Sequence, residues 1–464
     1  MRPTRHSHRQ LRSVVGLIAG ALAVIAAGAV APAAITVGAA ATAVAASGPV
    51  SPKPASGTPQ LAATGTTEQV RQIKQCGSNI YAVGSFTSIK WNGTTYSRNN
   101  AFSFSATAPY QVTSWNPNVN GKVNSIAFKD SSCSTAYLGG NFSSVHGTKV
   151  TDLAAVSPST GAVVSGFGHT TNGQVETLLV DRGRLLVGGY FTFINGTTRD
   201  YMASVDPVTG KDNGFLHLHI AGNYHFCSTT RCTASNPTRV YNQQRSHSGA
   251  FDLVEGDFTT VGGASRQQIF MLNLSTGTIT AWTSAEFSHA CWFTEPFYVR
   301  AASWSPDDST VYIATTGFHP FDKPTGSYPR TGLCDAAAAF SASQQAVSHK
   351  WINYTGCDSL YSTAADAGAA YFGGHERWSE NPDGCNFAGP GAIADTGMEG
   401  LAPATGKDLR NPDGTAVYKR GRGLGADDMR LTSAGLWIAS DNFNNANFCG
   451  GMAGHAGICF LPYG

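Results

Sequence analysis

An all-β fold is predicted by three features of this 464-residue sequence. A phrase made of an apolar run, a pair of small residues and a polar-aromatic turn recurs with drift. Short alternating apolar runs separate clusters of turn residues, and no helical periodicity of any length interrupts them. The phrase is centred on glycines 49 to 67 residues apart, namely Gly84, Gly140, Gly189, Gly256, Gly317 and Gly374. A strand-rich repeat of this length is typical of β-propellers and solenoids.

Each repeat divides into four short strands, as a propeller blade does. The third repeat shows this best, with strands expected at residues 175–180, 184–188, 201–205 and 213–218. Turns with a Thr-Gly ending, such as residues 158–161, link the third strand to the fourth, and their glycine supplies a positive φ.

Counting repeats gives seven, the last of them degenerate and short. They begin near Glu68, Gly121, Gly173, Val240, Phe297, Leu360 and Ala426. We therefore predict a seven-bladed β-propeller of four-stranded antiparallel blades over residues 67–464.

The N-terminal residues have the three parts of a secretory signal peptide, which we place at residues 1–46. Arg2, Arg5, Arg9 and Arg12 form a basic region, residues 14–30 an apolar core, and residues 43–45 a small-residue cleavage site. The alternative is an uncleaved anchor. Residues 47–66 are rich in Ser, Pro, Gly and Thr and are expected to be a flexible lead-in. This segment is one candidate for the fourth strand of the short last blade, which would close the ring and leave no exposed sheet edge.

Charge and cysteine content agree with export. Without the signal peptide, 27 basic residues face 29 acidic ones, a net charge of about −2 before histidine is counted. We therefore expect no nucleic-acid partner and, after cleavage, no membrane association. The mature protein is expected to be a secreted, extracellular monomer. Ten cysteines in an exported chain favour disulfides.

Alternate loops of a propeller lie on opposite faces, and this restricts the possible disulfides. Pairing on the top face is expected for Cys357 with Cys385 and for Cys291 with Cys334, and pairing on the bottom face for Cys76 with Cys133. Two further pairs would close short local loops, namely Cys227–Cys232 and Cys449–Cys459. Bridges in the top loops would stiffen a binding face.

The turns after the repeated phrase also repeat, at residues 92–95 and 195–198, both Asn-Gly-Thr-Thr. Together with these turns the phrases resemble the delta-60 repeat, kelch-like β-propellers, a family of exported bacterial proteins. The resemblance spans most of residues 68–460 and is also strong at residues 302–308 and 371–378. A Gly-Gly-His-x-Arg-Trp segment is similar to a feature of one secreted subgroup. The resemblance implies a propeller fold and no particular activity.

The segment His375, Glu376, Arg377 and Trp378 departs most sharply from the repeat. A functional interpretation is a ligand platform, in which Trp378 stacks on a sugar ring or a cation and Arg377 grips a carboxylate. Asp358, next to the expected Cys357 bridge, should lie close to it. The alternative is structural, with Trp378 packed between blades and Glu376 paired locally with Arg377.

A second aromatic segment, residues 289–295, should also face the top. Its Trp292 and Phe293 either extend a groove toward the sixth blade or cap the interface between blades. Oxygens of Asp427, Asp428 and Asp441 could bind Ca²⁺. Without a D-x-D-x-D-G loop, hydrogen-bonded turns are favoured at these aspartates, so we assign no metal site and no cofactor.

No catalytic residue is identified by a motif, since the sequence lacks a G-x-S-x-G elbow, an H-E-x-x-H helix and a phosphate-binding glycine loop. Carboxylates that could act as an acid or a base are Glu176, Glu255, Glu295, Glu376 and Asp358.

The predicted function is non-catalytic binding of an extracellular ligand, a glycan or another surface polymer, on the top face of a secreted propeller. One alternative is a carbohydrate-active hydrolase or lyase that uses acidic residues and His375 at the channel mouth. A second is a protein-interaction scaffold with a lateral hydrophobic patch and a protein ligand.

Overall fold

The computed structural model describes residues 48–223, 237–288, 291, 297–317, 332–443, 449 and 455–464. All of them belong to the second of two compact units, Ala43–Gly464. The described residues form strands and one 3₁₀ turn, η1 (Ala285–Ser288), with no α-helix among them. The prediction of an all-β fold is confirmed.

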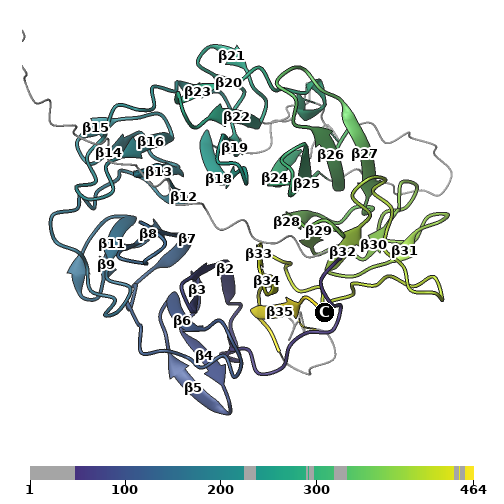
Figure 1. Ribbon diagram of the computed structural model, residues 1–464, viewed down its shortest axis with the longest axis horizontal. Helices are drawn as coiled ribbons and strands as arrows, with labels where there is room; N and C mark the ends of the chain where they lie inside the picture. Colours follow the sequence, from purple (N-terminus) through teal and green to yellow (C-terminus); the bar gives the residue numbers. More distant parts are fainter. Residues whose placement is uncertain are drawn as a thin grey trace, which may run out of the picture. The chain divides into compact units, whose positions relative to one another are not determined.

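The strands form successive antiparallel sheets, each named here by its first strand (Figure 1). The β2 sheet consists of β2 (Gln69–Cys76), β3 (Asn79–Ser85) and β6 (Ala101–Ser105). The β7 sheet consists of β7 (Lys122–Phe128), β8 (Ala136–Asn141) and β11 (Leu153–Val156). The β12 sheet consists of β12 (Val175–Asp181), β13 (Arg184–Gly189) and β16 (Met202–Val205).

Two four-stranded sheets follow. The β18 sheet consists of β18 (Arg239–Arg245), β19 (Phe251–Asp257), β22 (Ile269–Asn273) and β23 (Thr278–Ile279). The β24 sheet consists of β24 (Tyr298–Trp304), β25 (Thr310–Thr316), β26 (Ala336–Ser341) and β27 (His349–Tyr354).

The remaining sheets lie toward the C-terminus. The β28 sheet consists of β28 (Leu360–Ala365), β29 (Ala370–Gly374) and β32 (Met398–Leu401). The β33 sheet consists of β33 (Asp428–Thr432), β34 (Gly435–Ala439) and β35 (Ile458–Pro462).

Short ladders follow the second strand of several sheets. They are formed by β1 (Gln60–Leu61), β4 (Ser88–Trp91) and β5 (Thr94–Ser97); β9 (Ser144–Val145) and β10 (Thr148–Lys149); β14 (Phe193–Ile194) and β15 (Thr197–Thr198); β17 (Ile220–Ala221), β20 (Thr260–Val261) and β21 (Ala264–Ser265); and β30 (Trp378–Ser379) and β31 (Ile393–Ala394). In the repeated Asn-Gly turns, Asn92 and Gly93 both have positive φ, 47° and 78°, as a tight two-residue hairpin requires.

The fourth strand is shorter than predicted in several sheets. Residues 213–218 form no strand, and the β12 sheet continues only as a single bridge between Val205 and Asp212. Arg199 binds the Asp212 carboxylate through Nε at 2.8 Å and Nη2 at 2.6 Å, and Gly214 then turns the chain with a φ of 70°. Single bridges take the same place in three other sheets, at Phe104–Val112, Val156–Val163 and Leu401–Asp408.

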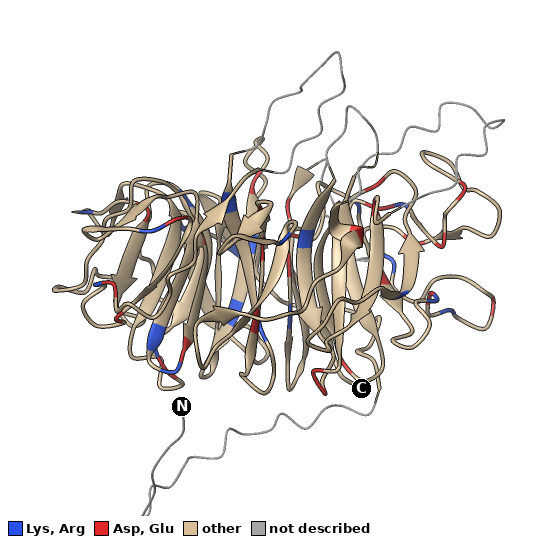
Figure 2. Ribbon diagram, turned by 90° about the horizontal axis from the view of Figure 1, so that it is seen from above, with Lys and Arg blue, Asp and Glu red and all other residues tan. Residues whose placement is uncertain are grey.

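Within the described unit the sheets have a propeller-like arrangement around a central axis, with the first strand of each sheet innermost (Figures 1 and 2). Each innermost strand contacts the next, in the order β2, β7, β12, β18, β24, β28 and β33, and β33 contacts β2. Apolar side chains fill the spaces between neighbouring sheets. Buried Trp437 of β34 is an example, with its ring 5.4 Å from that of Phe104 in the β2 sheet.

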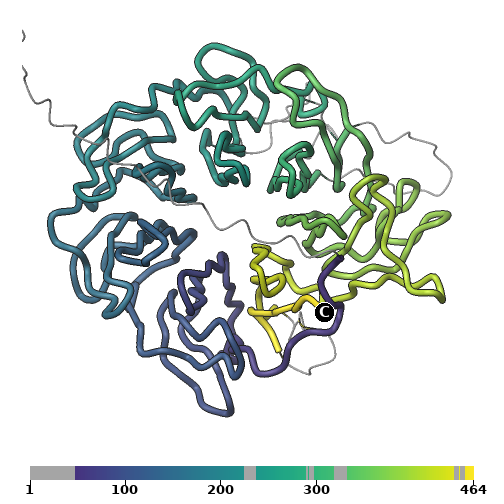
Figure 3. The backbone as a smooth tube through the Cα atoms, viewed as in Figure 1, coloured from purple at the N-terminus to yellow at the C-terminus, as the bar shows by residue number. Residues whose placement is uncertain are grey.

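The segment before β1 lies along the last sheet, where the two ends of the described unit run side by side (Figure 3). The backbone N–H of Ser51 donates to the carbonyl of Pro462 at 2.7 Å, and that of Ala55 donates to the carbonyl of Phe460 at 2.9 Å. Residues 51–55 therefore hydrogen-bond to the outer side of β35.

Four predicted disulfides are present among the described residues. They are Cys76–Cys133, Cys291–Cys334, Cys357–Cys385 and Cys449–Cys459. The predicted Cys227–Cys232 pair lies outside the described residues. Among the described residues, no helix is long and apolar enough to cross a membrane.

Candidate functional site

Every innermost strand from β2 to β28 has a β-bulge close to its start. In β2 the register shifts between Val70 and Gln72, so Arg71 is the additional residue. The corresponding residues of the other strands are Asn124, Glu176, Tyr241, Arg300 and Tyr361. In the last sheet, Asp428 pairs with Ala439, and the N–H of Asp427 donates to the carbonyl of the same Ala439. Two residues of β33 and its approach thus face one residue of β34, and Asp427 occupies the position of the bulged residue. A bulge changes the direction of a side chain relative to its neighbours in the strand.

In five repeats the glycine lies directly opposite this bulge, whereas Thr315 takes that place in the β24 sheet. Gly84 pairs with Val70, and a Cβ atom at Gly84 would lie 2.0 Å from the carbonyl oxygen of Gln69. The same contact would be 2.1 Å at Gly140 and 2.0 Å at Gly374, to the carbonyls of Lys122 and Ser359. Only glycine allows the two backbones to approach this closely. The repeat that predicts the fold is therefore the signature of the bulge.

The bulged residues line a central cavity of about 330 Å³. All the innermost strands contribute to its wall, and the wall is mostly polar. The basic residues of the wall are Arg71, Lys122, Arg239, Arg300 and Arg430, and the acidic ones are Glu176, Asp427 and Asp428. Figure 2 shows such charged positions on the strands themselves as well as on the loops.

Some of these charges neutralise one another. Arg430 Nε lies 3.0 Å from Asp428 Oδ1, and Arg430 Nη1 donates to Gln244 at 2.7 Å. Arg239 approaches Glu176 only to 3.7 Å. Arg239 Nε and Arg71 Nε are buried, and neither has a hydrogen-bond partner among the described residues.

Burial changes the proton affinity of several groups in the cavity. It raises the pKa of Asp427 to about 7, against the opposing effect of Arg71. It lowers the pKa of Lys122, and the nearby Arg71 guanidinium adds to that shift. Outside the cavity lining, burial and Arg430 also lower the pKa of Lys74, on the same strand as Arg71, to about 8. The cavity is thus crowded with positive charge, and one of its carboxyl groups titrates near neutrality.

His375 is joined to the cavity wall through Tyr361. The Tyr361 hydroxyl lies 3.2 Å from Nδ1 of His375, and the backbone N–H of Ser359 donates to Nε2 at 3.2 Å. Burial lowers the pKa of His375, which favours the neutral ring. Because Nε2 accepts a hydrogen bond, this network assigns the ring proton to Nδ1, which donates to the Tyr361 oxygen. The hydroxyl hydrogen of Tyr361 can then be donated to another group.

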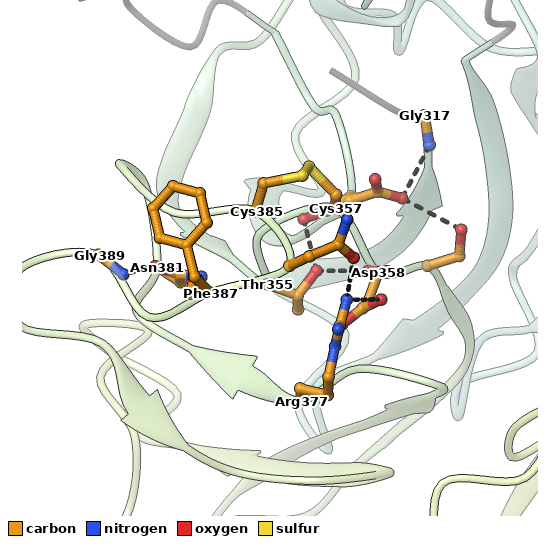
Figure 4. The surroundings of a disulfide bond; sticks show 12 residues. Gly317, Thr355, Cys357, Asp358, Arg377, Asn381, Cys385, Phe387 and Gly389 are labelled. Carbon is orange, nitrogen blue, oxygen red and sulfur yellow. Dashed lines mark hydrogen bonds and ion pairs between the residues drawn. A yellow bond between two sulfur atoms is a disulfide. The ribbon is translucent and has the colours of Figure 1, made fainter. Parts of the chain in front are cut away.

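Asp358 and Arg377 come together as predicted (Figure 4). Arg377 donates to the buried Asp358 carboxylate through Nε at 2.6 Å and Nη2 at 2.8 Å. Arg422 Nη2 binds the same carboxylate at 2.7 Å, and its Nε donates to the His375 carbonyl. The Cys357–Cys385 disulfide lies beside Asp358 and Arg377 in the same view (Figure 4). Sequence reasoning missed Arg422, whose only signal is its place between two glycines in residues 421–423.

Glu376 and Trp378 do not complete an exposed platform. The side chain of Glu376 is fully buried, because adjacent residues of an extended segment face opposite sides. Trp378 is half-buried at the start of β30, and its Nε1 is buried without a hydrogen-bond partner among the described residues. The interpretation of Glu376 as a surface group that orients a ligand is therefore corrected.

Glu376 instead belongs to a set of buried carboxyl groups in and beside the β28 sheet. The others are Asp395, Glu399 and Asp408. Burial raises the pKa of Glu399 well above its usual range, and the neighbouring Glu376 carboxyl adds to the effect. Burial likewise raises the pKa values of Glu376 and Asp395.

Other predicted features lie elsewhere. Residues 289–290 and 292–296, with Trp292, Phe293 and Glu295, are outside the described residues. Glu255 is fully buried in β19. The Asp441 carboxylate accepts backbone N–H groups of Leu424 at 2.8 Å and of Phe443 at 2.6 Å. In the described part of the chain, no three His, Cys, Asp or Glu side chains are placed to hold a metal ion.

Comparisons with known proteins do not identify a family. No family model matches the chain, and no curated protein is similar to it. Among solved structures, the computationally designed protein Ika8 matches with a TM-score of 0.43 and 9% identity, over 88% of this chain and 100% of Ika8. BamB from Moraxella catarrhalis matches with a TM-score of 0.39 and 11% identity, over 85% of this chain and 98% of BamB.

Proposed function

We propose that the chain is a secreted seven-bladed β-propeller of the delta-60 repeat type. The cyclic order of contacts between the innermost strands, with β33 against β2, supports a closed ring. The hydrogen bonds of Ser51 and Ala55 to β35 support a role for residues 47–66 in that closure. The disulfides are consistent with an oxidising, extracellular environment.

We infer that this propeller binds an extracellular ligand, a glycan or another surface polymer, without transforming it. The observation that carries the proposal is the central cavity of about 330 Å³, to which all the innermost strands contribute polar side chains. Cavities that bind small molecules usually measure about 300 to 1,000 Å³ and hold a few convergent polar groups. The cavity thus has room for one residue of a longer ligand.

The binding surface extends from the cavity mouth toward the sixth repeat. Tyr361 belongs to the wall and contacts His375, and the Arg377–Asp358–Arg422 group follows. The two disulfides at Cys334 and Cys385 join loops on this top face, and such loops are well suited to hold a ligand because they lose little conformational freedom on binding.

A second candidate is a carbohydrate-active enzyme, favoured by one specific observation. Asp427 lines the cavity and has a pKa of about 7, the range in which a carboxyl group can both give and take a proton at neutral pH. If the protein is a hydrolase or lyase, the wild type should shorten the bound polymer, and the Asp427→Asn variant should leave it intact.

The experiment is a glycan-array screen of residues 47–464 with three matched variants. Thr177→Trp fills the cavity, Arg377→Ala removes the outer arginine, and Lys149→Gln changes an exposed residue of β10 as a control. The proposal expects binding by the wild type and the control, and loss of binding with Thr177→Trp in a protein of unchanged circular dichroism. Binding that survives Thr177→Trp would exclude the cavity, and if it also depended on Arg377 the outer surface alone would be the site.

A further inference from the structure

We propose that the ligand carries an oxyanion, as an acidic sugar does, and that Arg71, Lys122, Arg239 and Arg300 receive it in the central cavity. This inference rests on the proposed function, and it adds the chemical class of the ligand. The charges of the wall are the first argument, because five basic residues face three acidic ones, and Asp428 is already paired with Arg430.

The positions of the basic residues along the strands place them at one end of the cavity. Arg71 and Arg300 are the bulged residues of β2 and β24, and Lys122 and Arg239 each precede the bulged residue of their own strand by two. All four residues line the cavity. The electrostatic influence of both Arg71 and Arg239 on the pKa of Lys122 agrees with a common location.

Some donor groups at this end have no protein partner, although Arg71 Nη2 donates to Gln69 at 2.8 Å. Arg71 Nε and Arg239 Nε are buried without hydrogen-bond partners among the described residues, an unfavourable state for a guanidinium. Arg300 lies over the ring of Tyr361, with its guanidinium carbon 5.2 Å from the ring centroid. A contact with a ring face fixes the guanidinium plane and leaves the N–H groups at its edge free to bind an anion.

Carboxylate, sulfate and phosphate groups share the chemistry that these donors recognise, because a guanidinium can bind two oxygens of any of them. The cavity of about 330 Å³ is large enough for one sugar ring with its acidic group. The hydroxyl of Tyr361, whose oxygen accepts from His375, adds a neutral donor for a ring oxygen or a hydroxyl group.

The test compares pairs of sugars that differ only in the charged group, with binding measured by titration calorimetry. The probes are galacturonate against galactose, N-acetylglucosamine 6-sulfate against N-acetylglucosamine, and glucose 6-phosphate against glucose. At least one acidic member is expected to bind, and its neutral partner to bind at least about tenfold more weakly, the effect of losing a hydrogen bond to a charged group. The pair with the largest difference identifies the oxyanion.

The variants are Lys122→Gln and Arg300→Gln. The control is Lys149→Gln, which removes one exposed charge from β10, outside the cavity. Each cavity variant should bind the acidic sugar about tenfold more weakly and should bind its neutral partner as the wild type does. The control should bind both sugars with wild-type affinity. Thermal unfolding of each variant, measured alongside, verifies that it is folded.

Two outcomes would overturn the inference in distinguishable ways. If neutral and acidic members bind equally and Thr177→Trp abolishes both, the cavity is a binding site and the oxyanion is not its target. If no glycan on the array and none of these sugars binds, the proposed function fails as well.

Discussion

Tyr361 and His375 are joined through the tyrosine hydroxyl and Nδ1, 3.2 Å apart, and this contact links the wall of the central cavity to the most unusual segment of the repeat. The rings meet edge to face with centroids 5.4 Å apart. Residues 375–378 stand out in the sequence by their composition. The contact between His375 and Tyr361 connects this segment to the central cavity, whose lining no sequence motif indicates.

Tyr361→Phe should weaken ligand binding at a modest cost in stability, because His375 Nδ1 loses its hydrogen-bond partner. The substitution keeps the ring that contacts Arg300 and removes only the hydroxyl that accepts from His375. Loss of one hydrogen bond to the ligand should reduce affinity by roughly 0.5–1.5 kcal/mol. Calorimetric titration with the sugar that the wild type binds best measures the effect. Unchanged affinity would show that the hydroxyl does not touch the ligand.

Gly140→Ala should destabilise the protein by about 1–3 kcal/mol, or more if the backbone cannot adjust. Its Cβ would lie 2.1 Å from the Lys122 carbonyl oxygen, at the bulge of β7. Gly48→Ala is the matched control, since nothing lies within 4 Å of its Cβ. Denaturant unfolding of both variants measures the difference. Equal stability of the two would mean that close approach does not explain the repeated glycine.

The all-β fold class and four disulfides were predictable from the sequence, because the glycine phrase recurs and because the paired cysteines lie on loops of the same face or within one short loop. The bulge opposite Gly84 was not predictable, since the sequence shows the small residue and not the additional residue facing it. The alternation that buries Glu376 was open to prediction, because Arg377 was expected at the surface and neighbours in an extended segment face opposite sides.

The basic lining of the central cavity escaped prediction for a different reason. Its five basic residues come from five strands far apart in the sequence, and each alone is an ordinary charge in a strand. Arg71 and Arg300, for example, become neighbours of one cavity only when the innermost strands meet around the axis.

Stability should decrease as the pH rises above the usual pKa of a glutamate, owing to the buried carboxyl groups of the β28 sheet. Burial raises the pKa values of Glu376 and Glu399, so the folded state favours their protonated forms. Their contribution is fully present below the usual pKa of a glutamate and is lost as the pH rises through the raised values. Glu399→Gln should therefore flatten the pH dependence and stabilise the protein at alkaline pH.

Urea unfolding between about pH 5 and about pH 9 tests this dependence. The control is Asp383→Asn, an exposed carboxyl group in the neighbouring loop. The control should keep the wild-type slope. A Glu399→Gln protein with the wild-type slope would show that this carboxyl group does not titrate on unfolding.

Removal of the Cys357–Cys385 disulfide should affect both stability and binding, whereas removal of Cys76–Cys133 should affect stability alone. Cys357 precedes β28 and Cys76 ends β2, so the two bridges lie at opposite ends of the innermost strands. The separations, 28 residues for Cys357–Cys385 and 57 residues for Cys76–Cys133, predict comparable losses of stability of about 3–4 kcal/mol. Only the Cys357 bridge adjoins Asp358, which holds Arg377 and Arg422.

The measurement pairs denaturant unfolding with ligand titration for Cys357→Ser/Cys385→Ser and Cys76→Ser/Cys133→Ser. Because the matched pair loses similar stability, a selective loss of affinity in the first variant must come from the loops of the sixth repeat. Equal affinity in the two variants would confine the binding site to the central cavity, whose wall is built from strands and does not depend on those loops.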